Sequence, residues 1–154
     1  IESNIENLLT ILIADNGIGM TEKQVESVTD PFYTTRTTRD VGLGIPFFKM
    51  AAEMASGSFN VQSEKGKGTR VFASFQRDHI DRMPMGDIAE TVSQLICLNE
   101  GINIVYHYVF NGQDFTVSTE ELSGILAGIP LNTPQVMSFV RDYVNENINA
   151  LNEI

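Results

Sequence analysis

The stretch LLTILIADNGIGM, from Leu8 to Met20, joins an apolar run to one acid and two glycines. The run Leu8–Ala14 is short, apolar except for one threonine, and closed by a turn signal, which predicts a buried strand. Asp15 then stands at the tip of that strand. Because Asp-Asn-Gly is also a common turn sequence, the pattern leaves open whether Asp15 only begins a turn or takes part in binding.

The composition is that of a globular chain with a core of its own. With 154 residues, 42% of them hydrophobic, it suits one medium domain or one domain with an appendage. Its apolar run is far shorter than the roughly 20 residues that span a bilayer, so we expect no membrane segment and a cytoplasmic protein. The single cysteine and two histidines exclude a disulfide framework and a zinc cluster. We expect Cys97 in the core, His107 on a polar face, and His79 in a structural or surface role.

The net charge of −10 is distributed unevenly. Residues 1–80 carry eight basic and ten acidic side chains, whereas residues 81–154 carry two basic and ten acidic ones. Such an acidic C-terminal part repels a phosphate backbone, which argues against nucleic acid as a partner. A basic protein partner and a plain solvated surface both remain open.

Local signals divide the first part of the chain into elements. A capping box of Thr21 with Gln24 predicts a short helix over 22–28, and Pro46 in a first turn indicates a helix over 45–55. Between them, residues 29–44 hold too many threonines and glycines for a helix and predict a loop of functional length. Strands over 58–63 and 70–76 flank EKGKGT as a hairpin. We therefore place a first domain at residues 1–80.

The second part has its own pattern of elements. Asp87 with Glu90 predicts a helix to about Leu98. Alternation over 102–110, a turn at NGQD and a strand at 115–117 predict a second hairpin, followed by a short helix and a long last one. We place a small, acidic α/β accessory module at residues 81–154, whose role as a sensory or docking unit stays open.

Three glycine doublets punctuate the first domain, none of them completed to a Rossmann or P-loop pattern. One of them, Gly42-Leu43-Gly44, runs directly into a predicted helix, where unpaired backbone N–H groups and the helix dipole favour an anion. The preceding loop adds cationic and hydroxyl donors suited to a polyphosphate, namely Thr34, Thr35, Arg36, Thr37, Thr38 and Arg39. A solvated loop without a ligand is the alternative.

At the other end of such a ligand, Asp15 has a candidate task. A carboxylate held at a strand tip can accept a hydrogen bond from an exocyclic amine, and Gly17 and Gly19 would let a flat ring lie against the backbone. Such a charge-assisted bond contributes about 1.5–3 kcal/mol. Adenine carries that amine where guanine does not.

The order and spacing of four motifs resemble the ATP-binding domain shared by histidine kinases, gyrase-type topoisomerases, ATP-dependent heat-shock chaperones and mismatch-repair ATPases. The motifs are DNGIGM, similar to the adenine box, DPFYTTR (Asp30–Arg36), VGLGIP (Val41–Pro46) and GKGTRVFASF (Gly66–Phe75). The resemblance covers Leu8 to Phe75, and the short lid over 33–41 is closest to the histidine kinases. It implies an α+β fold, a two-layer sandwich of helices on a mixed sheet.

The resemblance also assigns roles to residues. It implies that Asp15 binds the adenine amino group with support from Thr69, and that Gly42, Leu43 and Gly44 contact phosphates through backbone amides. Gly17 and Gly19 complete the adenine box, and Thr34, Thr35 and Arg36 the lid. Arg36 stands where the kinase pattern usually has lysine.

One family element is missing from the pattern. The family places a helix with a magnesium-binding asparagine before the adenine-box strand, and only seven residues precede Leu8 here. The cofactors implied are ATP and Mg²⁺, but we expect a fragment that lacks this helix and with it the magnesium site, binds ATP weakly and is inactive by itself. A sheet lacking one wall exposes apolar surface, so self-association into a homodimer is a further expectation.

Three functions stay open. The first is the ATP-binding part of a histidine-kinase-like signalling protein of a two-component system, which holds ATP for transfer to a histidine elsewhere, with an upstream phosphoacceptor domain as partner. The second is a non-catalytic regulator that senses ATP or ADP in the same pocket and docks a protein through its C-terminal module. The third is a scaffold with a vestigial pocket.

Overall fold

The computed structural model describes residues 2–3, 7–30, 43–99 and 101–153. The chain forms two compact units, Ile1–Met83 and Pro84–Ile154. Among the helices of the described residues, none combines the length and the apolar character needed to cross a bilayer.

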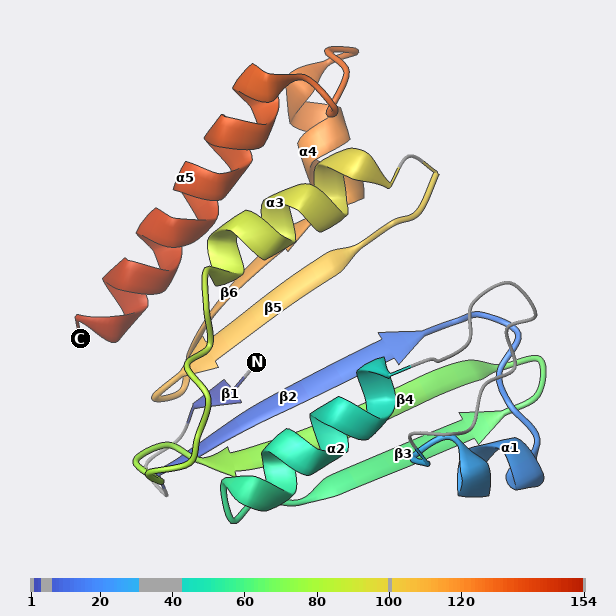
Figure 1. The fold of residues 1–154 in the computed structure, drawn as a ribbon. Coiled ribbons are helices and arrows are strands. Elements are labelled where there is room, and N and C mark those ends of the chain that lie inside the picture. The colour runs from blue at the N-terminus through green and yellow to red at the C-terminus, as the bar shows by residue number, and fades with distance from the viewer. Residues whose placement is uncertain (1, 4–6, 31–42, 100, 154) are drawn as a thin grey trace. The chain divides into compact units, whose positions relative to one another are not determined.

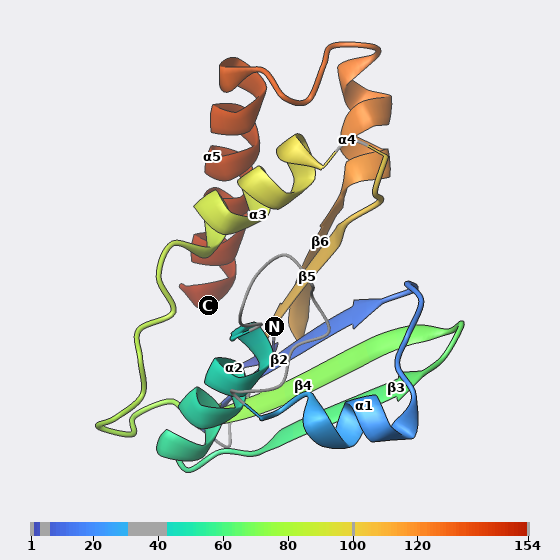
Figure 2. The same ribbon diagram turned by 45° about the vertical axis from the view of Figure 1, so that its right-hand side comes forward.

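The first unit is built on an antiparallel ladder (Figure 1). Its strands follow the order β3-β4-β2-β1 across the sheet, with bounds β1 (Glu2–Ser3), β2 (Leu8–Asp15), β3 (Phe59–Glu64) and β4 (Gly68–Gln76). Helix α1 (Glu22–Ser27) begins at the predicted capping box, with Thr21 and Gln24 bonded reciprocally. Helix α2 (Gly44–Met54) lies against one face of the sheet, as Figures 1 and 2 show. The α+β class that the resemblance implies is confirmed.

The core of this unit lies between α2 and the sheet. Ala52 and Ala55 are fully buried against Ala73 and Phe75 of β4. The ring of Phe48 lies 5.9 Å from that of Phe75, measured between centroids. This packing fixes α2 over the middle of β4, and the hydrogen bond from Gln76 N–H to the Ala55 carbonyl ties the end of the helix to the end of that strand.

Pairing across β3, β4 and β2 arranges the helix-facing side chains in rows. Two apolar rows, Phe59–Ala73–Ile11 and Val61–Val71–Ile13, are followed by one polar row, Ser63–Thr69–Asp15. Because side chains alternate along a strand, the three members of each row share one face. The polar row lies at the edge of the sheet where β2 and β3 end.

The expectation that β2 is a buried strand was wrong. None of its residues is buried, and Leu12 and Ile13 are each 56% exposed. Leu9 and Ile11 pack against the α2 cluster, the buried set Ala52, Ala55, Ala73 and Phe75, whereas Ile13 lies one row further along. Leu12 points to the opposite face, beside Phe72 and Arg70. An apolar run shows that a strand forms, but it does not show which rows a helix covers.

The second unit packs three helices against a hairpin. The hairpin consists of β5 (Val105–Phe110) and β6 (Gln113–Ser118), joined at Asn111-Gly112 with φ of 49° and 79°. Two successive positive φ values are typical of the two-residue turn that matches strand twist. The helices are α3 (Ile88–Leu98), α4 (Thr119–Leu126) and α5 (Pro134–Asn152), each begun by a side-chain cap. The largest fully buried residues are Ile96, Cys97, Val117, Leu122, Val140 and Val144.

The expectations for the single cysteine and for His107 are confirmed. Cys97 is fully buried among the helices of this unit, as a small apolar core residue is expected to be. His107 lies on the exposed side of β5, where Nε2 is 3.2 Å from the Asp114 carboxylate.

Tyr106 carries a buried hydroxyl that has no hydrogen-bond partner among the described residues. Burial, with a smaller contribution from Tyr108, raises the pKa of Tyr106. Tyr106→Phe is expected to raise the free energy of unfolding at pH 7 by about 1 kcal/mol, because it removes an unpaired polar group. The folded state holds the Tyr106 proton more tightly than the unfolded state, so the wild type loses stability as the pH rises above about 10. Thermal unfolding at pH 7 and pH 11 should show the advantage of the variant growing with pH.

The matched control is Tyr108→Phe. The Tyr108 hydroxyl donates to Asn152 Oδ1 at 2.7 Å, so this change is expected to lower the free energy of unfolding by about 1 kcal/mol. If Tyr106→Phe proves less stable than the wild type, the Tyr106 hydroxyl has a partner and the prediction is wrong.

Candidate functional site

Asp15 ends β2 and begins a turn at the same time. Its Oδ1 accepts a hydrogen bond from the Gly17 N–H at 2.7 Å, so the turn that the sequence allowed as an alternative does form. Asp15 is exposed, and its second carboxylate oxygen has no hydrogen-bond partner among the described residues. The turn therefore holds the carboxylate in place and leaves one oxygen for a ligand.

The loop after Asp15 lies tightly against the β3–β4 hairpin. A Cβ on Gly19, whose φ is +63°, would lie 2.0 Å from the Glu64 carbonyl oxygen. On the other side, a Cβ on Gly68 would lie 2.0 Å from the Asp15 carbonyl oxygen, and the Gly66 N–H donates to the Ile18 carbonyl at 2.7 Å. Gly19 thus allows the backbones of the loop and the hairpin to approach closely. The sequence had predicted a different role for this glycine, which was to let a ligand ring lie against the backbone.

A hydroxyl that the sequence analysis missed connects these segments. Ser63 Oγ accepts from the Met20 N–H at 2.8 Å and donates to the Gly68 carbonyl at 2.9 Å. It also lies 2.9 Å from Thr69 Oγ1. The signal was available in principle, because a hairpin closed over Lys65–Lys67 pairs residue 63 with residue 69.

Helix α2 begins at the expected glycine loop. Leu43 is its N-cap and makes no side-chain hydrogen bond to the first turn, so the N–H groups there are not capped by this side chain. A Cβ on Gly44 would meet nothing within 4 Å. The expected phosphate-binding residues Thr34, Thr35, Arg36 and Gly42 lie outside the described residues.

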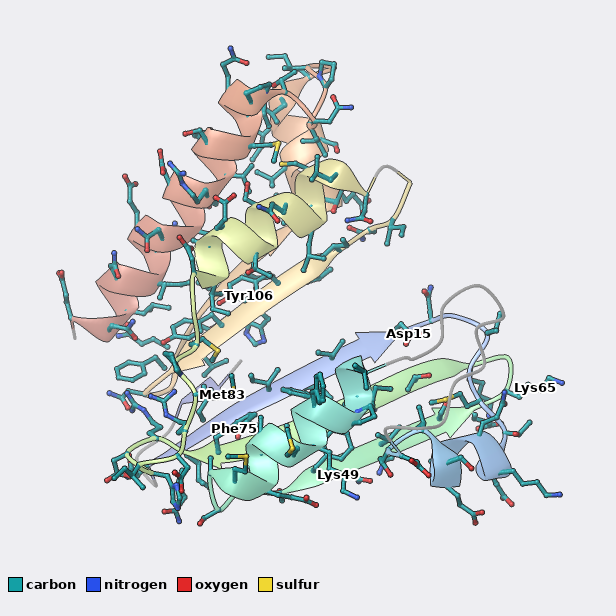
Figure 3. The ribbon with its side chains drawn as sticks, in the orientation of Figure 1. Asp15, Lys49, Lys65, Phe75, Met83 and Tyr106 are labelled. Carbon is teal, nitrogen blue, oxygen red and sulfur yellow. The ribbon has the colours of Figure 1, made fainter. Side chains whose placement is uncertain are left out.

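The two halves of the candidate site face the same side of the sheet. Helix α2 covers the face that carries the row ending in Asp15, and it runs antiparallel to β3. Its first turn therefore points toward the end of the sheet where β2 and β3 finish. Figure 3 shows Asp15 at the arrow end of β2. Helix α2 has its first turn toward the same end of the sheet.

The fit to a nucleotide can be judged from these donors and acceptors. A carboxylate oxygen beside the Thr69 hydroxyl suits an amine, and an uncapped helix start behind a glycine suits a phosphate. Within the described ranges, no three His, Cys, Asp or Glu side chains come together as a metal site.

The first unit has the α+β fold of an ATPase domain of the histidine-kinase type. Residues 1–79 match the family described as histidine kinase-, DNA gyrase B-, and HSP90-like ATPase. The chain belongs to this family, and the resemblance drawn from the four motifs is confirmed.

Among similar proteins are several sensor kinases. The chain is 37% identical over 73 residues to the autoinducer 2 sensor kinase/phosphatase LuxQ of Vibrio vulnificus, a match that covers 44% of this chain and 8% of that protein. It is 44% identical over 59 residues to sporulation kinase E of Bacillus subtilis, covering 38% and 8%. It is 33% identical over 85 residues to the sensor protein kinase WalK of Staphylococcus haemolyticus, covering 52% and 14%. The chain thus corresponds to a small part of each of these proteins.

Proposed function

We propose that this chain is the ATP-binding part of a histidine-kinase-like signalling protein of the cytoplasm, holding ATP for phosphoryl transfer to a histidine on another domain. The observation that carries the proposal is the position of Asp15. It lies at the end of a polar row on the face of the sheet that α2 covers. Homology to sensor kinases supports the same assignment.

The adenine end of the ligand lies at the polar row. One Asp15 oxygen accepts a hydrogen bond from the Gly17 N–H. The other accepts a hydrogen bond from the adenine amine. Thr69 stands beside Asp15 in the ladder and supports the same amine. Ile13, 56% exposed in the next row, offers an apolar surface for the flat ring. Gly19 keeps the loop close to the hairpin and out of the way of the base, and Gly17 holds the Asp15 carboxylate through its N–H.

The phosphate end lies at the start of α2. Gly42, Leu43 and Gly44 supply backbone N–H groups at the positive end of the helix dipole. The lid adds further donors to the phosphates, as the sequence pattern predicts, from Thr34, Thr35 and Arg36. ATP supplies the phosphoryl group, and these residues bind and orient its tail.

Titration of the full chain with ADP, followed by amide NMR, tests the proposal. We expect the Gly17, Gly19 and Gly68 amide signals to shift with ADP, and GDP to shift them only at much higher concentration. An unchanged spectrum at millimolar ADP, or shifts confined to residues 84–153, would contradict nucleotide binding at this site.

Gly44→Ala separates binding from folding. Because a Cβ there meets nothing within 4 Å in a helix, the variant is expected to be as stable as the wild type or up to about 1 kcal/mol more stable. The same Cβ would stand over the helix start where the phosphate approaches, so the ADP affinity is expected to fall severalfold. Thermal unfolding and the ADP titration measure the two effects.

The control for Gly44→Ala is Gly124→Ala. Gly124 lies within α4, and a Cβ there also meets nothing within 4 Å. This variant should share the unchanged or increased stability and leave the ADP affinity as it was. An ADP affinity that Gly44→Ala leaves unaltered would remove the start of α2 from the proposed site.

A second candidate function is a nucleotide-sensing regulator without catalysis. In that case the acidic second unit docks a protein, and several large apolar side chains of this unit are exposed, among them Leu98, Ile102, Val105, Ile125 and Phe139. Incubation of the longest gene product with ATP labelled on its terminal phosphate distinguishes the two. Acid-labile phosphohistidine supports the kinase, whereas ATP binding without transfer supports the regulator.

A further inference from the structure

Ser63 has a complete set of hydrogen bonds beside the proposed adenine site. Its Oγ meets the Met20 N–H at 2.8 Å, the Gly68 carbonyl at 2.9 Å and the Thr69 hydroxyl at 2.9 Å. A serine hydroxyl has one proton to donate and two lone pairs that accept. These three contacts use all of them.

The directions of these bonds follow from the partners. A backbone N–H only donates and a carbonyl only accepts, so Ser63 accepts from Met20 and gives its one proton to Gly68. The proton between Ser63 and Thr69 must then come from Thr69. Since the Thr69 hydroxyl makes no other hydrogen bond among the described residues, its oxygen presents only lone pairs to the site.

We propose that Ser63 is a positioning residue of the nucleotide site: it makes Thr69 a hydrogen-bond acceptor beside Asp15, and thereby helps select a purine with a 6-amino group. This inference rests on the proposed ATP binding. The row Ser63–Thr69–Asp15 crosses three strands on one face, so the Thr69 hydroxyl that Ser63 orients lies beside Asp15.

The consequence is a site with two acceptors and no donor at the base. The free Asp15 oxygen and Thr69 Oγ1 suit the two hydrogens of the adenine amine. A hypoxanthine or guanine ring places a carbonyl oxygen at this position, which faces lone pairs on Thr69 and forms no hydrogen bond there. Ser63 touches no ligand itself and acts through Thr69.

The test compares ADP with IDP, which carries an oxygen in place of the 6-amino group. In Ser63→Ala, Thr69 no longer gives its proton to Ser63 and can turn it toward the IDP oxygen. The ratio of the IDP to the ADP dissociation constant, measured by NMR titration of the full chain, is expected to fall about fivefold, the effect of one neutral hydrogen bond.

Two further variants separate positioning from general damage. In a Thr69→Val background, Ser63→Ala should leave the ratio unchanged, because the residue through which it acts is gone. Ser58→Ala is the control, since it removes a hydroxyl just before β3 that pairs with Ser74 Oγ of β4 at 2.8 Å. It should leave the ratio at its wild-type value.

The outcomes distinguish this inference from the proposed function. If the wild type binds ADP and Ser63→Ala weakens ADP and IDP equally, the role of Ser63 is only structural and the inference is overturned. If the wild type binds neither nucleotide, the proposed function itself fails. Should Ser63→Ala not fold, Ser63→Cys provides a weak donor and acceptor of similar size, and an unaltered ratio there also overturns the inference.

Discussion

Gly68→Ala is expected to lower the free energy of unfolding of the first unit by about 3 kcal/mol or more and to weaken ADP binding with it. Gly68 has a φ of +99°, a conformation that costs an L-residue about 1–2 kcal/mol. A Cβ there would also lie 2.0 Å from the Asp15 carbonyl oxygen and 2.8 Å from Asn16 Cα. Both neighbours are backbone atoms, so the contact cannot be relieved by a side-chain rotation. The β2 tip and the hairpin must move apart, and Asp15 moves with them.

Gly66→Ala is the matched control in the same hairpin. Gly66 has a φ of +84°, but a Cβ there meets nothing within 4 Å. It is expected to cost only the conformational part, about 1–2 kcal/mol. Urea unfolding followed by amide signals of the first unit measures both variants. If both variants lose the same free energy of unfolding, the close approach of residue 68 to the Asp15 carbonyl adds no steric cost.

The part of the fold that could be predicted is the part set by local chemistry. The caps at Thr21 and Asp87 were predicted from the pairs Thr21/Gln24 and Asp87/Glu90 and form as expected. The NGQD turn also forms, because Asn111 and Gly112 both tolerate positive φ. Each of these signals depends on neighbours within a few residues, so no tertiary contact had to be known.

The part that could not be predicted depends on which rows of the sheet are covered. The strand at Leu8–Ala14 was expected to be buried, yet Ile13 is 56% exposed because the α2 cluster packs on the rows of Leu9 and Ile11. Ser63 was missed for a related reason. Its role follows from the register that pairs it with Thr69, and register depends on the length of the turn.

The motifs predicted that Asp15 and Thr69 lie close together in the candidate site. Asp15 and Thr69 were proposed as partners from a motif, and the ladder places them opposite each other. The two glycines of DNGIGM were proposed to admit a ligand ring. The structure shows that Gly19 also meets a requirement of packing, because it approaches the Glu64 carbonyl closely. The role toward the ring stays a prediction.

Asp15→Asn is expected to lower the ADP affinity about ten- to a hundredfold while leaving the fold intact, the effect of losing a charge-assisted hydrogen bond. The side chain keeps its size, and the amide oxygen can still accept from the Gly17 N–H that Oδ1 now binds at 2.7 Å. That bond turns the amide NH₂ toward the site. A donor then faces the adenine amine, which is also a donor.

The same substitution should change the preference among purines. The new NH₂ group can donate to the 6-oxygen of IDP, so IDP binding should stay the same or become tighter while ADP binding weakens. Glu26→Gln removes the same charge from an exposed position of α1 and is expected to alter neither affinity. NMR titrations of the three proteins with both nucleotides measure the effect. If Asp15→Asn and Glu26→Gln have the same ADP and IDP affinities, the carboxylate does not contact the base and the proposed nucleotide orientation is wrong. If Asp15→Asn weakens ADP and IDP binding equally, Asp15 acts through the turn alone.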